Sequence, residues 1–416
     1  MDKLLRSHAD SITAAAIKAV QPDEAVARAL RGREFPGRVL LAAAGKAAWQ
    51  MARAAHDCLG SRIEQGVVVT KYGHVMGPIA NFDCREAGHP VPDENSFSGT
   101  QAALELVQGL TAQDTVLFLL SGGGSALFEK PLVPGPQLQD VTKQLLACGA
   151  DIVEINTIRK RLSAVKGGRF AQVCAPARVF SIVLSDILGD PLDMIASGPA
   201  YPDASTAAQA LAIAEKYKLE LSDEARDLLS RETPKELDNV TTQITGSVRE
   251  LCAAAERAAR ELGYAPVLLT DQLCCEAREA GSFLASILRT HQGSEKSLAF
   301  IAGGETVVHL TGKGKGGRNQ ELALAASAGI QGLEGAAEFS VGSDGTDGPT
   351  GAAGGYADSQ TFGELSAHGL ELFRVMADND AYHALQATGG LIVTGPTGTN
   401  VNDFAMALLW RGARPA

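Results

Sequence analysis

The sequence contains few aromatic residues, no excess of basic residues and no long apolar run. Only 5% of its 416 residues are aromatic, and 37 Lys and Arg residues face 48 Asp and Glu residues, which gives a net charge of −11. Because a protein that binds duplex nucleic acid needs a basic surface to displace counterions, this charge argues against a nucleic-acid partner. No stretch of about 18 apolar residues occurs, so we expect no membrane-spanning segment.

The sequence also lacks the cysteine pairs of a secreted scaffold. It has seven Cys residues, an odd number, and none lies in a C-x-x-C pair. Residues 1–30 mix acids and bases, unlike a signal or transit peptide, so we expect free thiols in the reducing cytoplasm. At about 150 residues per domain, the chain is long enough for two or three domains with ordinary apolar cores.

Short β-branched runs that end in Gly or Asp alternate with Ala-rich and Leu-rich segments of helical periodicity. This alternation predicts an α/β fold with a largely parallel sheet flanked by helices in the N-terminal domain. The predicted strands are Val39–Ala44, Gly66–Thr70, Thr115–Leu120, Arg178–Leu184, Ala265–Leu269, Ser297–Ala302, Thr306–Leu310, Phe339–Val341 and Leu391–Thr394. The predicted helices are Ala47–Leu59, Asn95–Gln108, Leu138–Ala147, Asp151–Ala164, Val248–Leu262, Ala277–Thr290 and Asn319–Ala328.

Two features divide the chain into domains. The apolar runs of Ala299–Leu310, separated by two glycines, predict a β-hairpin, and hence a smaller C-terminal α/β domain with a mixed sheet. The stretch Ala204–Asn239 has no strand signal and contains Thr233-Pro234, a local helix stop. We therefore place the domain boundary near residue 235, with domains 1–235 and 236–416.

Two polar turns follow predicted strands of the N-terminal half, where ligands bind in open α/β sheets. One turn consists of Ser121, Gly122, Gly123, Gly124 and Ser125. Its backbone N–H groups and the next helix N-terminus form a candidate cradle for a phosphate or an oxyanion, and a flexible turn is the alternative.

The other turn brings a cation to the start of a helix. Gly45-Lys46 follows the first predicted strand, and a bound anion would explain a Lys at a helix N-terminus. Five further bases gather downstream in this acidic protein: Arg159, Lys160, Arg161, Lys166 and Arg169. Such a cluster suits an anionic substrate or nucleotide, although a solvated helix face is the more common explanation.

Carboxylates and an amide follow other predicted strands. They are Asp186, Asp344, Asp347 and Asn400, the last three in Gly-rich loops. Their oxygen atoms suit Mg²⁺ or the hydroxyl groups of a sugar-like substrate. Asp186 is also a candidate acceptor of a hydroxyl proton, or a simple cap of a turn.

A second Gly-rich loop lies in the C-terminal half. It consists of Gly312, Lys313, Gly314, Lys315, Gly316 and Gly317, and Arg318 follows it. The loop matches the dinucleotide-binding pattern G-x-G-x-x-G, but it contains or adjoins three basic residues. A dinucleotide site also has an acidic residue about 20 residues after the loop, whereas Asp344 lies 27 residues beyond Gly317. Positive charge on a flexible loop favours a polyphosphate, and the absence of hydrolase and zinc motifs favours phosphoryl transfer.

Taken in order, the motifs resemble one family. The runs S-G-G-G-S-A-L (121–127), I-N-T-I-R-K-R-L-S-A-V-K-G-G (155–168), G-K-G-K-G-G-R-N-Q-E (312–321) and T-G-P-T-G-T-N-V-N-D (394–403) resemble the class II glycerate 2-kinase family. The resemblance covers nearly the whole chain. Residues 10–235 resemble its N-terminal kinase domain, which implies a Rossmann-like sheet, and residues 297–410 resemble its MOFRL domain.

The resemblance implies that ATP and Mg²⁺ serve to phosphorylate the 2-hydroxyl of D-glycerate, in a cleft between the domains. It implies that Lys46 and Arg318 are catalytic. We expect the loops 121–125 and 312–317, with Asn400, to bind the nucleotide, and Arg159 or Lys166 to bind the glycerate carboxylate. Asp186, Asp344 and Asp347 are the candidate metal ligands, and either Asp186 or Asp344 would receive the hydroxyl proton.

Two other functions stay open at this stage. One is an NAD(P)H-dependent hydroxypyruvate reductase, because relatives of the family have carried that label and the loop at Gly312 matches a dinucleotide fingerprint. The other is a non-catalytic sugar-acid binding protein, although simple binding needs fewer charged groups. The sequence leaves the oligomeric state open, a homodimer being one option.

Overall fold

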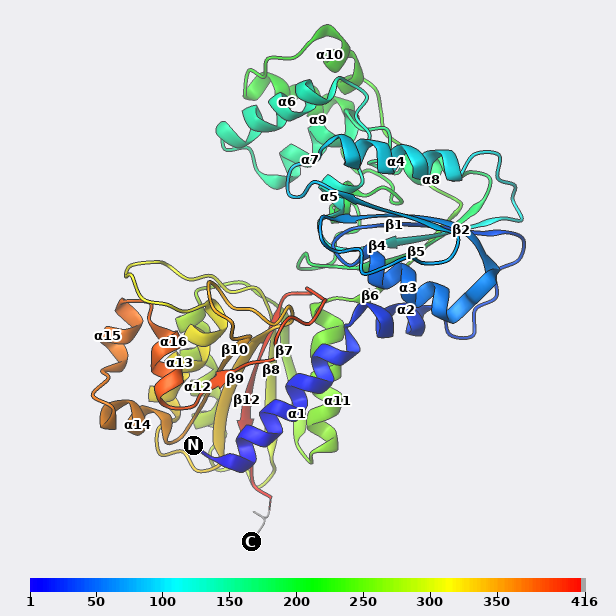
Figure 1. The fold of residues 1–416 in the computed structure, drawn as a ribbon. Helices are drawn as coiled ribbons and strands as arrows, with labels where there is room; N and C mark the ends of the chain where they lie inside the picture. Colours follow the sequence, from blue (N-terminus) through cyan, green and yellow to red (C-terminus); the bar gives the residue numbers. More distant parts are fainter. Residues whose placement is uncertain (413–416) are drawn as a thin grey trace. The chain divides into compact units, whose positions relative to one another are not determined.

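The structure, a computed structural model, describes residues 1–412 and contains two six-stranded sheets (Figure 1). The chain divides into two compact units, which we name after their sheets. The parallel-sheet unit comprises Pro22–Ser185 and Asp190–Thr245. The mixed-sheet unit comprises Met1–Gln21, Asp186–Gly189 and the described chain from Gly246 onward. The predicted α/β fold with one largely parallel and one mixed sheet is confirmed.

The parallel-sheet unit has the strand order β3-β2-β1-β4-β5-β6, and every pairing among β1 to β5 is parallel. The strands are β1 (Val39–Ala44), β2 (Ile63–Lys71), β3 (Phe82–Ala87), β4 (Thr115–Leu120), β5 (Arg178–Leu184) and β6 (Val240–Gly246). This is the order of a doubly wound sheet, in which the connections change direction between β1 and β4. Ligands of such sheets bind at that point, beyond the carboxyl ends of the two strands.

Helices cover both faces of the parallel sheet, which explains why β1 and β4 are buried along their whole length. Leu41 packs with α2 and α3, whereas its neighbour Leu40 packs toward α4, α5 and α8. Four further helices, α6, α7, α9 and α10, form a separate apolar cluster. The helices are α2 (Pro22–Leu30), α3 (Ala48–Leu59), α4 (Glu94–Leu106), α5 (Gly124–Leu127), α6 (Gly135–Ala147), α7 (Ile152–Arg161), α8 (Arg169–Cys174), α9 (Ala207–Lys216) and α10 (Asp223–Leu229).

The mixed-sheet unit has the strand order β11-β10-β9-β12-β8-β7. Strand β7 pairs in parallel with β8, and the other neighbouring strands of this sheet pair antiparallel. The strands are β7 (Ala265–Leu273), β8 (Leu298–Gly304), β9 (Ala336–Gly342), β10 (Gly354–Asp358), β11 (Leu391–Ile392) and β12 (Asp403–Leu409).

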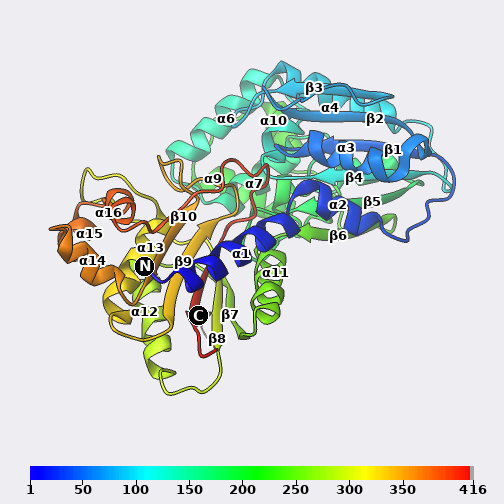
Figure 2. The same ribbon diagram turned by 60° about the horizontal axis from the view of Figure 1, so that its bottom comes forward.

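Helices also cover both faces of the mixed sheet. Helices α1 and α11 lie on one face, and α12 and α13 lie on the other (Figures 1 and 2). Three short helices, α14 to α16, pack beside α13. The helices are α1 (Lys3–Ala19), α11 (Val248–Glu261), α12 (Ala277–Thr290), α13 (Arg318–Ile330), α14 (Thr361–Ala367), α15 (Leu372–Ala377) and α16 (Ala381–Ala387).

The hairpin predicted within Ala299–Leu310 is wrong. The antiparallel neighbour of β8 is β12, and Thr306–Leu310 forms no strand. Val307 makes only an isolated parallel bridge with Glu276. The chain leaves the sheet here because the backbone beyond this segment is hydrogen-bonded to residues 378–380 instead of to a strand.

The compact units do not follow the boundary predicted near residue 235. Strand β6 extends the parallel sheet to Gly246, and α1 packs in the mixed-sheet unit through apolar residues such as Leu5 and Ile12. Figure 2 shows α1, in blue, beside α11, in green, although more than 200 residues separate them in the chain. An amphipathic N-terminal helix does not reveal from its own sequence which sheet it will cover.

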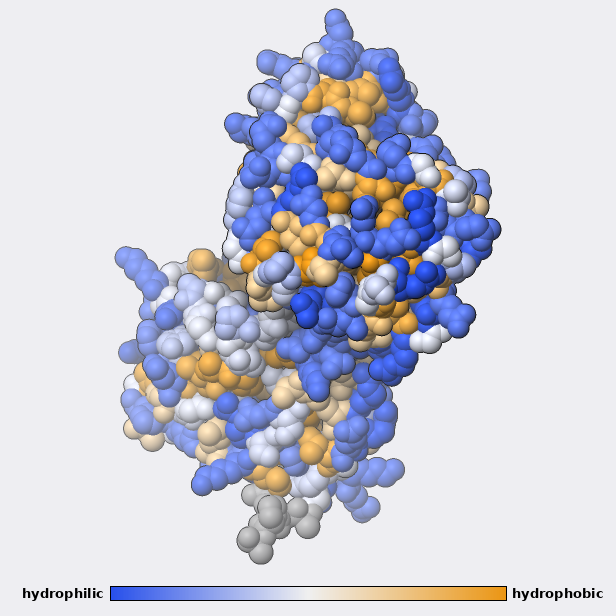
Figure 3. Space-filling view, turned by 45° about the vertical axis from the view of Figure 1, so that its right-hand side comes forward, coloured by the Kyte–Doolittle hydropathy of each residue, from blue (hydrophilic) through white to orange (hydrophobic). Residues whose placement is uncertain are grey.

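No helix among residues 1–412 is both long and apolar enough to cross a membrane. The face of the molecule drawn in Figure 3 is mostly hydrophilic and carries small apolar areas. This finding agrees with the absence of a long apolar run in the sequence.

One buried carboxyl group lies inside the mixed-sheet unit without a polar partner. Glu338 on β9 is fully buried, and neither of its carboxyl oxygens has a hydrogen-bond partner among the described residues. Burial raises the pKa of Glu338 well above its usual value. The folded protein therefore keeps this carboxyl protonated at pH values at which the unfolded chain has released the proton.

We predict that Glu338→Gln stabilises the protein at neutral pH. The pKa of Glu338 is higher in the folded protein than in the unfolded chain. The free energy of unfolding of the wild type is therefore highest below the pKa of the unfolded chain. It falls as the pH rises toward the pKa of the folded protein, by up to about 3 kcal/mol at pH 7. The Gln variant lacks this loss. Urea unfolding at pH 5 and pH 7.5 should show an advantage of the variant that grows with pH. An advantage that is the same at both pH values would contradict the prediction.

Candidate phosphoryl-transfer site

The predicted anion-binding turns of the parallel-sheet unit lie at the point where the strand connections change direction. Gly45 and Lys46 follow β1, and Ser121 to Ser125 follow β4, its neighbour. The backbone N–H of Lys46 donates to the carbonyl of Gly122 at 2.9 Å, and the N–H of Ala47 donates to Ser121 Oγ at 3.0 Å. The two turns therefore form one structure at the carboxyl edge of the sheet.

Two glycines make this close approach feasible. Gly45 has φ 126°, and a Cβ atom there would lie 2.2 Å from Ser121 Oγ. Gly123 has φ 84°, and its Cβ would lie 3.0 Å from His89 Nε2 and 3.2 Å from Lys46 Cγ. The glycine run thus opens the backbone next to the Lys46 side chain, as a phosphate cradle requires.

His89 is a residue of this site that the sequence did not reveal. It lies against Gly123 and within the electrostatic reach of several bases. Burial lowers the pKa of His89, and the charges of Lys46, Lys71 and His74 lower it further. A concentration of positive charge that makes a histidine harder to protonate is a favourable environment for an anion. A lone His before Pro90 carries no sequence signal for this role.

The two predicted substrate cations converge on the end of the glycine turn. Arg159 Nη2 and Lys166 Nζ both donate to the carbonyl oxygen of Ser125, at 3.0 and 2.9 Å. Lys166 also donates to Phe128 and forms an ion pair with the buried Glu129 at 3.3 Å. The Lys166 side chain has no exposed surface, and burial lowers its pKa to about 8 despite the attraction of Glu129. These contacts favour a supporting role beneath the turn, and its contact with substrate stays a prediction.

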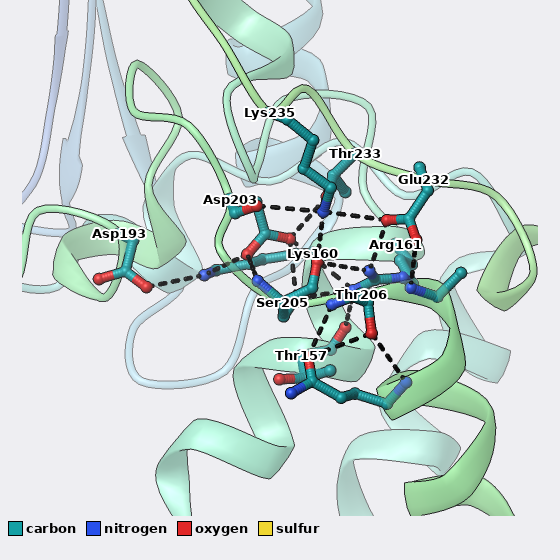
Figure 4. Close-up of polar contacts among 12 residues, drawn as sticks. Thr157, Lys160, Arg161, Asp193, Asp203, Ser205, Thr206, Glu232, Thr233 and Lys235 are labelled. Carbon is teal, nitrogen blue, oxygen red and sulfur yellow. Dashed lines mark hydrogen bonds and ion pairs between the residues drawn. The ribbon is translucent and has the colours of Figure 1, made fainter.

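The remaining bases of the predicted cluster are bound within the protein, as Figure 4 shows for Lys160 and Arg161. Lys160 forms ion pairs with Asp193 and Asp203, and Arg161, which is fully buried, lies within 3.7 Å of Asp203 and 3.4 Å of Glu232. Arg169 donates to three backbone carbonyls of residues 160–163. Most of this basic run therefore holds helix α7 to the segments 203–206 and 232–235.

The Gly-rich loop of the mixed-sheet unit borders a cavity of about 540 Å³. The lining residues are Thr306, Val307, Val308, Leu310, Gly312, Gly314, Gly316, Gly317, Arg318, Glu321, Asp347, Gly348, Pro349 and Asn379. Its volume is typical of small-molecule sites.

The loop itself is fixed by the turn at Asp378–Asp380. Asn379, at φ 56°, accepts from the N–H groups of residues 311 and 312 through its side-chain oxygen. The N–H groups of residues 313 to 315 donate to Asp378 or Asp380. A Cβ on Gly312 would lie 2.2 Å from the Asp378 backbone, so the glycine serves this packing. The backbone of 311–315 is thus engaged within the chain, which leaves the N–H groups of residues 316 and 317 as the candidates for a phosphate.

Arg318 begins helix α13 and is held by two carboxylates. Its guanidinium donates to both carboxyl oxygens of Asp403 and, at 3.0 Å, to Glu305. Burial alone would lower the pKa of Arg318, but the hydrogen bonds and the charges of Asp403 and Glu305 raise it above its usual value. The Arg318 side chain is 34% exposed and lines the cavity, so a fixed positive charge is available there.

Asp186 joins this network through Asn402, a residue that the sequence analysis passed over. The Asn402 side chain donates to the Asp186 carbonyl at 3.2 Å and to Glu305 at 3.1 Å. Asn402 has φ 67°, in the left-handed region that Asn adopts more readily than most residues other than glycine. Asn402 and Asp403 end the motif at 394–403, but no local signal reveals that they contact Glu305 and Arg318, because these partners are distant in sequence.

The predicted metal ligands do not converge. Asp347 is buried at the N-terminus of α13, where it accepts from the backbone N–H groups of Asn319 and Gln320. Burial raises the pKa of Asp347 to about 6. Asp344 Oδ1 accepts from Thr346, and Asn400 is exposed on the loop before β12. Within residues 1–412 no group of three His, Cys, Asp or Glu side chains is arranged to hold a metal ion.

The fold and the site define a class of protein: an α/β enzyme with cations and glycine turns at the ends of its strands. A family described as "Domain of unknown function (DUF4147)" matches residues 8–230, and the "MOFRL family" matches residues 298–403. The D-glycerate 2-kinase of Thermotoga maritima is 52% identical over 97% of this chain and 98% of its own. The glycerate 2-kinase of Pyrococcus horikoshii is 40% identical over 95% of each chain.

Solved structures agree with these matches. The crystal structure of glycerate kinase from Thermotoga maritima covers 98% of this chain and all of its own, with a TM-score of 0.94 and 51% identity. A protein of Agrobacterium vitis that is 37% identical over 95% of this chain and 92% of its own is named a putative hydroxypyruvate reductase. The chain belongs to the glycerate 2-kinase family.

We predict that Lys166→Met destabilises the protein by about 3 kcal/mol, because it leaves the buried Glu129 without its counter-charge. The double variant K166M/E129Q should lose less stability than K166M alone, since it removes the unpaired charge. The free energies of unfolding of the wild type, both variants and E129Q, measured with denaturant, form a double-mutant cycle. A Lys166→Met protein of wild-type stability that has lost its affinity for substrate would instead assign Lys166 to substrate binding.

Proposed function

We propose that the protein is an ATP-dependent kinase that transfers the γ-phosphoryl group to the 2-hydroxyl of D-glycerate. The observation that carries this proposal is the similarity to D-glycerate 2-kinase along nearly the entire chain. The local geometry supports it, because Lys46 lies beside an open glycine turn and Arg318 lines a cavity of suitable volume. We also place the enzyme in the cytoplasm, in keeping with its seven free cysteines.

In this proposal the chain acts mainly by positioning and by charge, as in other phosphoryl transfers. The turn Gly122–Ser125 and Lys46 bind anionic oxygens of the reactants. Arg318, kept charged and oriented by Asp403 and Glu305, stabilises the charge that develops on the transferring phosphoryl group. Arg159 binds the glycerate carboxylate.

The reaction forms a bond from the 2-hydroxyl oxygen to the γ-phosphorus and breaks the bond from that phosphorus to ADP. The hydroxyl proton passes to a carboxylate, either Asp186 or Asp344. The backbone carbonyl of Asp186 accepts from Asn402, which also donates to Glu305, a partner of Arg318, so Asp186 belongs to the network around Arg318.

Mg²⁺ would neutralise charge on the nucleotide phosphates. A site of this kind needs only one or two protein carboxylates, because the phosphates supply the other ligands. Asp347 is a poor candidate, because it is buried at the start of helix α13 and accepts hydrogen bonds there, and Asp186 and Asp344 stay the candidate ligands.

We predict that Lys46→Ala and Arg318→Ala each lower kcat by about 10³-fold or more, because each removes positive charge from the transferring group. The measurement couples ADP formation to NADH oxidation, with D-glycerate, ATP and Mg²⁺ as substrates. Circular dichroism checks that both variants remain folded.

Matched controls are Lys143→Ala, on the exposed side of α6, and Arg374→Ala, whose side chain is 84% exposed on α15. Both should keep wild-type kcat. A Lys46 or Arg318 variant that keeps about a tenth of the wild-type kcat would refute the corresponding catalytic role, since the loss would be far smaller than expected.

We predict that EDTA abolishes phosphoryl transfer without changing the stability of the protein. A metal that bound to a preformed protein site would stabilise the fold, and its removal would lower the melting temperature. Because no three-carboxylate centre occurs in residues 1–412, we expect the melting temperature to change by less than about 1 °C. A clear fall in melting temperature on chelation would reveal a resident metal instead.

The reductase named among the relatives is the second candidate. In doubly wound dinucleotide-binding sheets an acid near the end of the second strand binds the ribose. In the parallel-sheet unit, β2 ends at Lys71, a base in place of that acid. In the mixed-sheet unit, the backbone N–H groups of 311–315, at the G-x-G-x-x-G loop, are already hydrogen-bonded within the chain. Both features argue against the binding of NAD(P)H by this protein. Oxidation of NADH or NADPH by hydroxypyruvate in the absence of ATP would overturn this assignment.

A further inference from the structure

The cavity beside Arg318 has an unusually exposed apolar wall. Val307 is 52% exposed and Leu310 is 82% exposed, the largest value among the large apolar residues of the described chain. Both line the cavity, together with Val308 and the exposed Pro349. Apolar side chains that gather in a concave site usually mark the place of an apolar ligand surface.

This wall is held in place at both ends. The Val307 backbone accepts from the N–H of Ala277 at 2.9 Å and donates to Cys275 at 3.0 Å, next to the start of α12. The His309 carbonyl accepts from Asn379 at 3.1 Å, and Thr311 donates back to Asn379. The segment is therefore fixed although it belongs to no strand. Val308 packs against the apolar core, whereas the exposed side chains of Val307 and Leu310 line the cavity.

The polar side chains of the cavity are bound to one another. Asn379 donates to Glu321, Glu321 also pairs with Arg278, and Asp347 accepts from the first turn of α13. These groups form the cavity wall, and Arg318 contributes its positive charge. The cavity thus combines a cation with a separate apolar surface.

We propose that Val307, Leu310 and Pro349 form the subsite for the base of the nucleotide. This inference rests on the proposed function, whose ligands are a nucleoside triphosphate and glycerate. Glycerate consists of a carboxylate and hydroxyl groups, and the phosphates are anionic, so neither gains from contact with Val307 or Leu310. The base alone has a broad apolar face, and Arg318 in the same cavity is suited to the phosphates attached to it.

The test measures the affinity of ADP by calorimetry for the wild type, for Leu310→Asn and for the double variant V307T/L310N. We expect the Kd of ADP to rise roughly tenfold in the double variant, because the base loses much of its apolar contact. The Kd of inorganic tripolyphosphate, which has no base, should stay unchanged. Because Leu310 is highly exposed, its replacement leaves the fold intact.

The matched control is Phe373→Asn, on α15, whose side chain is 78% exposed and does not line the cavity. It should bind ADP as the wild type does. An unchanged ADP affinity in the double variant, or an equal loss of tripolyphosphate affinity, would overturn the base subsite even in an active glycerate kinase. The expected selective loss of ADP affinity in a protein that transfers no phosphate to glycerate would support the subsite and refute the proposed function.

Discussion

The close approach of two backbone turns, at positions where a side chain would not fit, is the constraint on which both candidate sites depend. In the parallel-sheet unit, Gly45 allows the turn after β1 to touch the turn after β4, and this contact places Lys46. In the mixed-sheet unit, Gly312 allows its loop to lie on the Asp378–Asp380 turn, and the loop ends at Arg318. Each cation is thus positioned by backbone packing, which fixes a charge more rigidly than a mobile surface loop does.

The charges of the protein fall into two groups with different consequences. Lys160, Arg161 and Lys166 are buried and bound to carboxylates or carbonyls, so they connect helices and turns. Arg318 is also bound to carboxylates, but about a third of its side chain is exposed and the residue lines a cavity. An arginine oriented by two acids loses little conformational freedom when a phosphate binds, and this pre-organisation is what phosphoryl transfer requires.

The sequence predicted the inner strands of the parallel sheet better than its edge strand β3, the buried central strand β12 of the mixed sheet, and the partners of the site residues. The strands β1, β4 and β5 have the predicted bounds, because buried parallel strands are continuous apolar runs that end at polar turns. Strand β3 lies at an edge of its sheet and contains three charged residues among six, which is unusual for a strand. Strand β12 has the sequence D-F-A-M-A-L-L, a composition that also suits a helix. The glycine turns and their cations are local signals. Their partners, such as Asn379, Asn402 and Asp403, are determined by contacts between residues far apart in the chain.

The position of α1 has a consequence for how the chain is made. Helix α1 is translated long before β9 and β12, the two central strands of the sheet on which it packs. At a translation rate of about 5–20 residues per second, the apolar face of α1 stays uncovered for roughly 20 to 80 s before these strands are complete. Meanwhile the parallel-sheet unit has all its strands by residue 246. Before β12 is made, the nascent protein therefore carries a folded parallel-sheet unit and an uncovered amphipathic helix, the kind of segment that chaperones bind.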